Sequence, residues 1–295
     1  MVACAMVAAF FLLRADLTRR GFGSDSEAEA EKLIAVPCLA GIAGAKLYHV
    51  FESPRELFAD PYHQIFSQYG FAWFGGLLAG FAAFLLLAHS IAKRTPSAGR
   101  KVSMLELLDA GSPAAALGYG VGRIGCLLSG DGDYGIPTSL PWGMSFPHGL
   151  VPTTQRVHPT PIYELIVACL IAWLLWRLGA RQVRAAALAR QKSGGRIDIE
   201  TISRTKYLYP RRVWLRLRYT WFLFRSAPAY GDVFAAYLVL TGIARFLVEF
   251  IRINPRSFFG MSNAQAASIA SVIVGVILWW KLSPRTSDRA SRAKP

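Results

Sequence analysis

Long runs of apolar residues, separated by polar or basic linkers, constrain this chain more than any other feature. Hydrophobic residues make up 53% of the 295 residues and charged residues only 17%, against about 25% charged in soluble domains. The runs cover residues 1–13, 33–51, 71–92, 104–128, 161–178, 231–251 and 264–280. A helix needs about 20 mostly apolar residues to cross a bilayer. The sequence therefore predicts an all-α polytopic membrane protein with about seven transmembrane helices. The first run is too short to span, so we expect the sequence to begin inside the first helix.

The cations of the chain are concentrated in alternate linkers. The net charge of +15 by itself would suit a nucleic-acid partner. However, most lysines and arginines lie in the linkers 14–32, 93–101 and 177–228 and in the tail from residue 281. That distribution follows the positive-inside rule and predicts an outer N-terminus, a cytoplasmic C-terminus and no nucleic-acid partner.

The same distribution predicts the domain organisation. We expect residues 1–282 to form one membrane domain that includes a basic cytoplasmic linker at 179–228, and 283–295 to form a disordered basic tail. The segment 129–159, rich in Pro and Gly, becomes a loop on the outer (periplasmic) side. The cysteines show no CxxC pair and no histidine at metal-ligand spacing, so we expect no disulfide framework, metal site or cofactor.

A Gly-rich stretch, residues 118–135, closes the fourth apolar run and carries a single cation, Arg123, ahead of two acids, Asp131 and Asp133. An arginine next to apolar runs is costly unless it pairs with a carboxylate, a carbonyl or a ligand phosphate. The stretch is therefore the first candidate for a functional site.

A second group of charges lies in the sixth apolar run. Arg245 and Glu249 are four residues apart, on one helical face, and Arg252 follows. The predicted orientation brings them to the same outer depth as Arg123. Arginine suits bidentate phosphate recognition, and the phosphate at this depth would be a phospholipid headgroup. The structural alternative is an ion pair between Arg245 and Glu249, with Arg123 capping a helix carbonyl.

Four further residues combine polar groups with a span end. Lys46, near the end of the second run, suits either snorkelling to the interface or ligand binding. His158 precedes the fifth run, and a lone histidine in a Pro-rich loop is more often structural. Tyr163 and Glu164 enter the first turn of that run, where a binding role and a structural role are equally supported.

Taken together and in order, these motifs resemble the prolipoprotein diacylglyceryl transferase family over nearly the whole chain. The family's Gly-Arg signature corresponds to 122–131, its His-Pro motif to 158–164 and its Gly-x-x-Arg motif to 242–252. The shorter segments 44–48 and 74–76 also correspond. The chain is therefore identified as a divergent member.

The resemblance implies a transferase of the bacterial cytoplasmic (inner) membrane that acts in lipoprotein biosynthesis. It would move an sn-1,2-diacylglyceryl group from phosphatidylglycerol to the lipobox cysteine thiol in the signal peptide of a preprolipoprotein, forming a thioether. The implied catalytic residues are Arg123, Arg245, Glu249 and Asp131. The implied substrate-binding residues are Arg123, Lys46, Tyr48, Gly75, Gly76, His158, Tyr163, Glu164 and Arg252.

The sequence departs from the family pattern at positions that handle protons. Phe74 replaces a family histidine that is a leading candidate for the base, and Cys126 and Ser129 replace two asparagines. The acidic position of the signature falls on Asp131 or Asp133, because the segment before Gly135 is one residue longer.

These departures leave Glu249, Asp131 or His158 as candidate bases. They also leave two alternative functions open. One is a non-catalytic phospholipid-binding paralogue, and the other is diacylglyceryl transfer to another acceptor.

Overall fold

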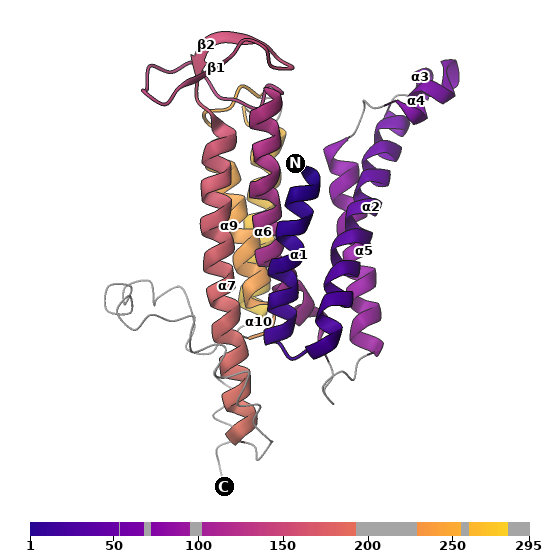
Figure 1. Cartoon of the computed structure of the whole chain (residues 1–295), viewed down its shortest axis with the longest axis vertical. Coiled ribbons are helices and arrows are strands. Elements are labelled where there is room, and N and C mark those ends of the chain that lie inside the picture. Colours follow the sequence, from indigo (N-terminus) through magenta and orange to yellow (C-terminus); the bar gives the residue numbers. More distant parts are fainter. Residues whose placement is uncertain (53, 68–71, 95–101, 193–228, 255–259, 283–295) are drawn as a thin grey trace. The chain divides into compact units, whose positions relative to one another are not determined.

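The computed structural model describes every residue except 53, 68–71, 95–101, 193–228, 255–259 and 283–295 (Figure 1). The predicted tail at 283–295 and most of the predicted basic linker therefore lie outside the described residues. The chain divides into two compact units, one comprising 1–21 and 108–295 and the other 22–107. Each unit is described by itself below.

The first unit contains the larger helical bundle and a small sheet. Its elements are α1 (Val2–Arg19), α6 (Met104–Ser129, which begins in the other unit), β1 (Met144–Phe146), β2 (Thr153–Val157), α7 (Thr160–Lys192), α9 (Asp232–Val248) and α10 (Asn263–Leu282). The antiparallel pair β1–β2 lies at the end of α6 and the start of α7 (Figure 1).

The second unit is built around two long helices. Its elements are η1 (Gly23–Asp25), α2 (Ser26–Glu52), α3 (Pro54–Ala59), α4 (Pro61–Phe66) and α5 (Trp73–Arg94). The linker between the second and third apolar runs therefore contains two short helices, α3 and α4.

A described helix lies at each of the seven apolar runs, so the predicted helical class is confirmed. Four helical segments are long and apolar enough to cross a membrane: 23–52, 74–93, 160–188 and 263–282. The other three helices, α1, α6 and α9, do not reach that level. α1 carries three charges in 18 residues, and α9 has only 17 residues. By length and composition, the described helices thus include four candidate spans, and the predicted number of seven is not confirmed by this criterion.

Two basic linkers are shorter than the sequence predicts, because helices continue into them. α1 extends to Arg19, since Asp16 pairs with both Arg19 and Arg20. Arg19 also donates to the carbonyl of Trp176 in α7 at 3.0 Å and stacks over its ring. α7 itself has 33 residues and continues to Lys192, well into the expected linker.

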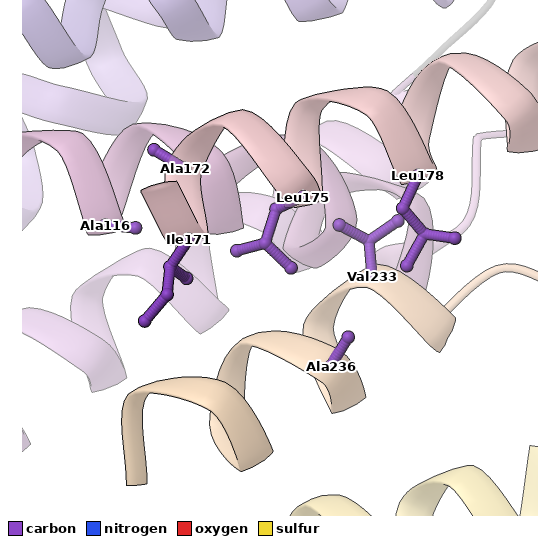
Figure 2. Close-up of a cluster of buried hydrophobic side chains, with 7 residues drawn as sticks. All are labelled: Ala116, Ile171, Ala172, Leu175, Leu178, Val233 and Ala236. Carbon is purple, nitrogen blue, oxygen red and sulfur yellow. The ribbon is translucent and has the colours of Figure 1, made fainter. Parts of the chain in front are cut away.

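An apolar cluster at the centre of the first unit fixes α6, α7 and α9 together (Figure 2). Leu175 and Leu178 from α7 lie against Val233 and Ala236 from α9, and Ala116 faces them from α6. Each of the three helices contributes an alanine to the cluster, and such small side chains allow close approach.

A buried polar network fixes the N-terminal end of α9. The Asp109 carboxylate, on α6, accepts hydrogen bonds from the backbone N–H groups of Gly231 at 2.7 Å and Phe234 at 2.8 Å, and from the Gln182 amide at 2.7 Å. The first N–H groups of a helix have no partner within the helix, so this carboxylate caps α9 from a neighbouring helix. Position and rotation of α9 are thereby set relative to α6.

At the other end, backbone hydrogen bonds join three segments that are distant in sequence. Gly135 N–H donates to the carbonyl of His158 at 2.8 Å, and Ile136 N–H donates to the carbonyl of Ile251 at 2.8 Å. A Cβ on Gly135 would lie 2.5 Å from the Ile251 oxygen, so the contact requires glycine. The loop after α6, the start of α7 and the end of α9 therefore meet at one place.

In the second unit, α2 and α5 approach closely through glycines. A Cβ on Gly75 would lie 2.4 Å from the Gly44 carbonyl oxygen, and a Cβ on Gly44 would lie 2.7 Å from that of Gly75. Gly76 and Gly41 make a similar but looser contact. Such contacts between small residues are typical of helix pairs in membranes.

Candidate active site

Three arginines and three carboxylates alternate in a closed ring where the ends of α6, α7 and α9 meet. We call this set the ion-pair ring; in order around it, the members are Arg123, Asp133, Arg252, Glu249, Arg245 and Glu164. Each member comes from one of the three segments that the backbone hydrogen bonds hold together. Opposite charges thus alternate at every step.

Asp133 occupies the position between Arg123 and Arg252. Its Oδ2 atom lies 2.6 Å from Nη1 of Arg123, and its Oδ1 atom binds Nη2 of Arg252. Burial would raise the pKa of Asp133, but the two guanidinium groups outweigh it and hold that pKa below the ordinary value of 3.8. The carboxylate is therefore ionised throughout the physiological range.

Glu164 has the most partners in the ring. Arg245 donates to its Oε1 atom at 2.8 Å, Arg123 pairs with Oε2, and Arg252 Nη1 lies 3.6 Å from Oε2. The hydroxyl of Tyr119 donates to Oε1 at 3.2 Å. Because its side chain is only 4% exposed, Glu164 stabilises the three arginines from inside the bundle.

Glu249 closes the ring from α9. Its Oε2 atom lies 3.0 Å from Arg245 and 3.8 Å from Arg252, and Oε1 accepts a hydrogen bond from the Asn254 amide at 2.5 Å. The sequence predicted the pair between Arg245 and Glu249 from their spacing, and it is present. It is one link of the ring and not an isolated intrahelical pair, and Arg123 binds two carboxylates.

Asp131, the other acid of the Gly-rich stretch, lies outside the ring. Its Oδ1 atom accepts a hydrogen bond from the backbone N–H of Asp133 at 3.2 Å. The structure therefore places Asp133, and not Asp131, on the arginines. Among the described acids of this site, Asp131 alone has no arginine partner.

Cys126 lies beside both acids. Its Sγ atom is 3.4 Å from Nη1 of Arg123, and the ligand atoms of Cys126, Asp131 and Asp133 all lie within 4.8 Å of one another. Three such groups could hold a cation. However, Asp133 already binds two guanidinium groups, whose positive charge opposes a metal ion at this point.

A separate chain of hydrogen bonds connects Trp142, Tyr163 and His158. The Trp142 indole N–H donates to the Tyr163 oxygen at 2.8 Å, and that oxygen lies 3.1 Å from Nδ1 of His158. Indole N–H is only a donor, so the Tyr163 hydroxyl accepts from it, and the hydroxyl proton is available for Nδ1 of His158. When Tyr163 donates to Nδ1, a neutral ring carries its proton on Nε2.

The remaining predicted site residues belong to the second unit. Nζ of Lys46 lies 3.0 Å from the carbonyl oxygen and 2.9 Å from the hydroxyl of Ser67, so it holds the chain after α4. Gly75 and Gly76 pack α5 against α2, and Tyr48 and Phe74 are exposed. Within its own unit this group forms no further cluster of charges among the described residues.

Besides Trp142, two residues of the site were missed by sequence reasoning. Tyr119 lies one helical turn before Arg123, a spacing that places both on one face and was available in the sequence. Asn254 lies beyond the end of α9, and only the fold brings its amide to Glu249.

The geometry defines a class of protein. The bundle of the first unit includes α7 and α10, which are long and apolar enough to cross a membrane. At one end of this bundle lie three buried or half-buried arginines aligned by carboxylates. Such a site suits recognition of an anionic group at the surface of a lipid bilayer.

Comparison with known proteins places the chain within that class. The family described as prolipoprotein diacylglyceryl transferase matches residues 1–208 and 207–281, and the chain belongs to this family. A phosphatidylglycerol–prolipoprotein diacylglyceryl transferase of Clostridium tetani is 27% identical, covering 95% of this chain and 90% of the relative. Relatives of the same name from Verminephrobacter eiseniae and Clostridium perfringens are 28% and 26% identical, covering 93% and 95% of this chain and 83% and 88% of the relatives.

Proposed function

We infer that this chain transfers a diacylglyceryl group from phosphatidylglycerol to a prolipoprotein during lipoprotein maturation. The ion-pair ring is the observation that carries this inference, together with membership of the family. Relatives that share nearly the full length of the chain bear the name of this activity. The acceptor that we propose is the thiol of the lipobox cysteine in the signal peptide of a preprolipoprotein.

The three arginines suit the leaving group of this reaction. The acceptor sulfur would form a bond to the glyceryl carbon of the lipid, and the bond from that carbon to the phosphate oxygen would break. Glycerol phosphate would leave with the bonding electrons. Developing charge on the departing phosphate would be stabilised by Arg123, Arg245 and Arg252, which the ring carboxylates hold in position.

The acceptor thiol must lose a proton, and we propose Asp131 as the group that takes it. Glu164, Glu249 and Asp133 already bind two or three arginines each, so proton uptake by any of them would break an ion pair. Asp131 lies in the same loop without such a partner. Phe74 stands where the family has a histidine, and a carboxylate in the site would supply the missing function.

The location that we propose is the bacterial cytoplasmic membrane, with seven spans, the N-terminus outside and the C-terminus in the cytoplasm. The positive-inside distribution supports this orientation and brings the ion-pair ring to the outer leaflet. α1, α6 and α9 would cross the bilayer as inner members of the bundle, where buried ion pairs and hydrogen bonds satisfy their polar groups.

Rescue of a bacterium depleted of its own transferase would test this function. We expect the unmodified chain to restore growth and the lipid modification of a tagged lipoprotein, and Arg123→Ala to restore neither. Arg156→Ala is the matched control, because Arg156 lies in β2 and, among the described residues, donates only to the carbonyls of Pro141 and Gly143. Failure of the unmodified chain at normal expression would contradict the proposal.

A second function, lipid binding without catalysis, is favoured by Phe74. A phenyl ring cannot accept a proton, so the chain could bind phospholipid without modifying a protein. Transfer in the unmodified chain separates the two functions, because the proposed function predicts measurable transfer and the second function predicts none. If the unmodified chain is inactive, Phe74→His should create activity where the rest of the site is intact.

A further inference from the structure

The ion-pair ring holds equal numbers of arginines and carboxylates. Each arginine binds at least two carboxylates, so each guanidinium charge of the ring is already balanced by neighbouring acids. A phosphate that bridges two of these arginines as a ring carboxylate does would take the place of that carboxylate.

The three carboxylates differ in how easily they can leave. Glu164 and Glu249 have side chains that are 4% and 1% exposed, and each accepts a further hydrogen bond, from Tyr119 and Asn254. Asp133 is 29% exposed, and among the described residues only the two arginines donate hydrogen bonds or ion pairs to its carboxylate. Removing Asp133 from the ring therefore breaks the fewest contacts, and its carboxylate already has access to solvent.

The backbone at Asp133 also permits movement that a helix would not. Asp133 follows Gly130 and Gly132, whose φ values of 57° and 90° lie in the left-handed region. Glycine adopts such conformations and their alternatives with little steric penalty. Glu164 and Glu249, in contrast, lie on α7 and at the end of α9, where the helix fixes the backbone.

Shape and charge both match a phosphodiester to the position of Asp133. Its two oxygens bind one arginine each, which is the arrangement that two non-bridging phosphate oxygens would make. Without Asp133 the ring carries three positive and two negative charges. One phosphodiester, with a single negative charge, restores neutrality.

We propose that the Asp133 carboxylate occupies the phosphate position of the empty ring and is displaced from Arg123 and Arg252 by the phosphodiester of the lipid donor. Before lipid binds, Asp133 keeps the arginines paired and oriented. Any anion that binds in its place must first break the ion pairs of Asp133 with Arg123 and Arg252, so its binding is weaker. That the displacing anion is a phospholipid rests on the proposed function.

Binding of a fluorescent short-chain phosphatidylglycerol to the full chain in neutral detergent micelles tests this inference. We expect Asp133→Asn to bind the lipid about tenfold more tightly, since the arginines are released from competition. Glu31→Gln is the control for loss of one negative charge and should change the dissociation constant by less than about threefold, because Glu31 is exposed on α2 and is not a member of the ring. Equal or weaker binding by Asp133→Asn would overturn the inference.

Inorganic phosphate, titrated in the same assay, distinguishes a lipid site from a general anion site. If Asp133→Asn lowers the dissociation constants of both phosphate and lipid, Asp133 competes with anions of either source. If it lowers only that of the lipid, the acyl chains contribute to the displacement of Asp133. Either result supports displacement. Binding is measured without an acceptor peptide and does not depend on transfer activity. If the unmodified chain transfers no lipid but Asp133→Asn still binds lipid more tightly, the proposed function is rejected and this inference is retained.

Hydrogen exchange in the unmodified chain covers the case in which Asp133→Asn does not fold. Residues 129–135 should exchange faster when saturated with phosphatidylglycerol, because Asp133 leaves the ring. Unchanged or slower exchange at saturation would contradict displacement.

Discussion

At the scale of single residues, Asp131 and Asp133 differ by two positions and yet have different partners. Asp133 binds Arg123 and Arg252, whereas Asp131 binds a backbone N–H group. Motif spacing left the two acids as alternatives. The choice depends on the turn that Gly130 and Gly132 make and on Arg252, more than a hundred positions away, so no local pattern could decide it.

The ion pairs of Asp133 predict a pH dependence of stability. Because its pKa is lower in the folded chain than the ordinary value of 3.8, Asp133 stabilises the fold fully above that value. The contribution is lost as pH falls from 3.8 through the folded-state pKa. We therefore expect the unmodified chain to lose more thermal stability between pH 5 and pH 3 than Asp133→Asn does, with melting followed by tryptophan fluorescence in detergent. Equal losses in both chains would contradict this assignment.

His158 gives a second prediction at this scale. If the chain from Trp142 through Tyr163 leaves the proton of His158 on Nε2, the ring serves as a hydrogen-bond donor to the substrate. The Gln amide reaches the position of Nε2, and the shorter Asn amide reaches that of Nδ1. We expect His158→Gln to retain within about tenfold of the kcat/KM for lipid and His158→Asn to lose about a hundredfold. Equal, severe losses in both variants would instead identify a base.

At the scale of elements, the helices follow from the sequence and their ends do not. Apolar runs placed the seven long helices that the structure describes, because hydrophobic periodicity can be recognised in the sequence without knowing which element packs against it. The ends of α1 and α7 depend on tertiary contacts.

The contact between α2 and α5 predicts the effect of a single methyl group. Gly75→Ala places a Cβ 2.4 Å from the Gly44 carbonyl oxygen, so the helices must separate. We expect a loss of about 1–3 kcal/mol of unfolding free energy, measured by denaturant titration in micelles. Gly122→Ala is the matched control in α6, because nothing lies within 4 Å of its Cβ position. A loss of stability in the control as large as that in Gly75→Ala would show that the space at the contact is not the cause.

At the scale of the whole molecule, the polar groups of the first unit gather at the two ends of the bundle. One group, around Asp109, Arg20 and Gln182, fixes the start of α9. The other is the ion-pair ring at its far end. The apolar cluster of α6, α7 and α9 lies between them. The first group thus sets where α9 lies, and the position of α9 sets where Arg245 and Arg252 meet the other members of the ring.

The central claim is that the ion-pair ring binds the phosphate of a lipid donor during transfer to a protein thiol. The most direct measurement incubates the purified chain with phosphatidylglycerol labelled in its acyl chains and a lipobox peptide, and follows the peptide by gel shift and mass. We predict a labelled peptide heavier by one diacylglyceryl group, and a rate at least about a hundredfold lower in Arg123→Ala with Arg156→Ala unaffected. A peptide that stays unlabelled while a known transferase modifies it in parallel, or full activity in Arg123→Ala, would contradict the claim.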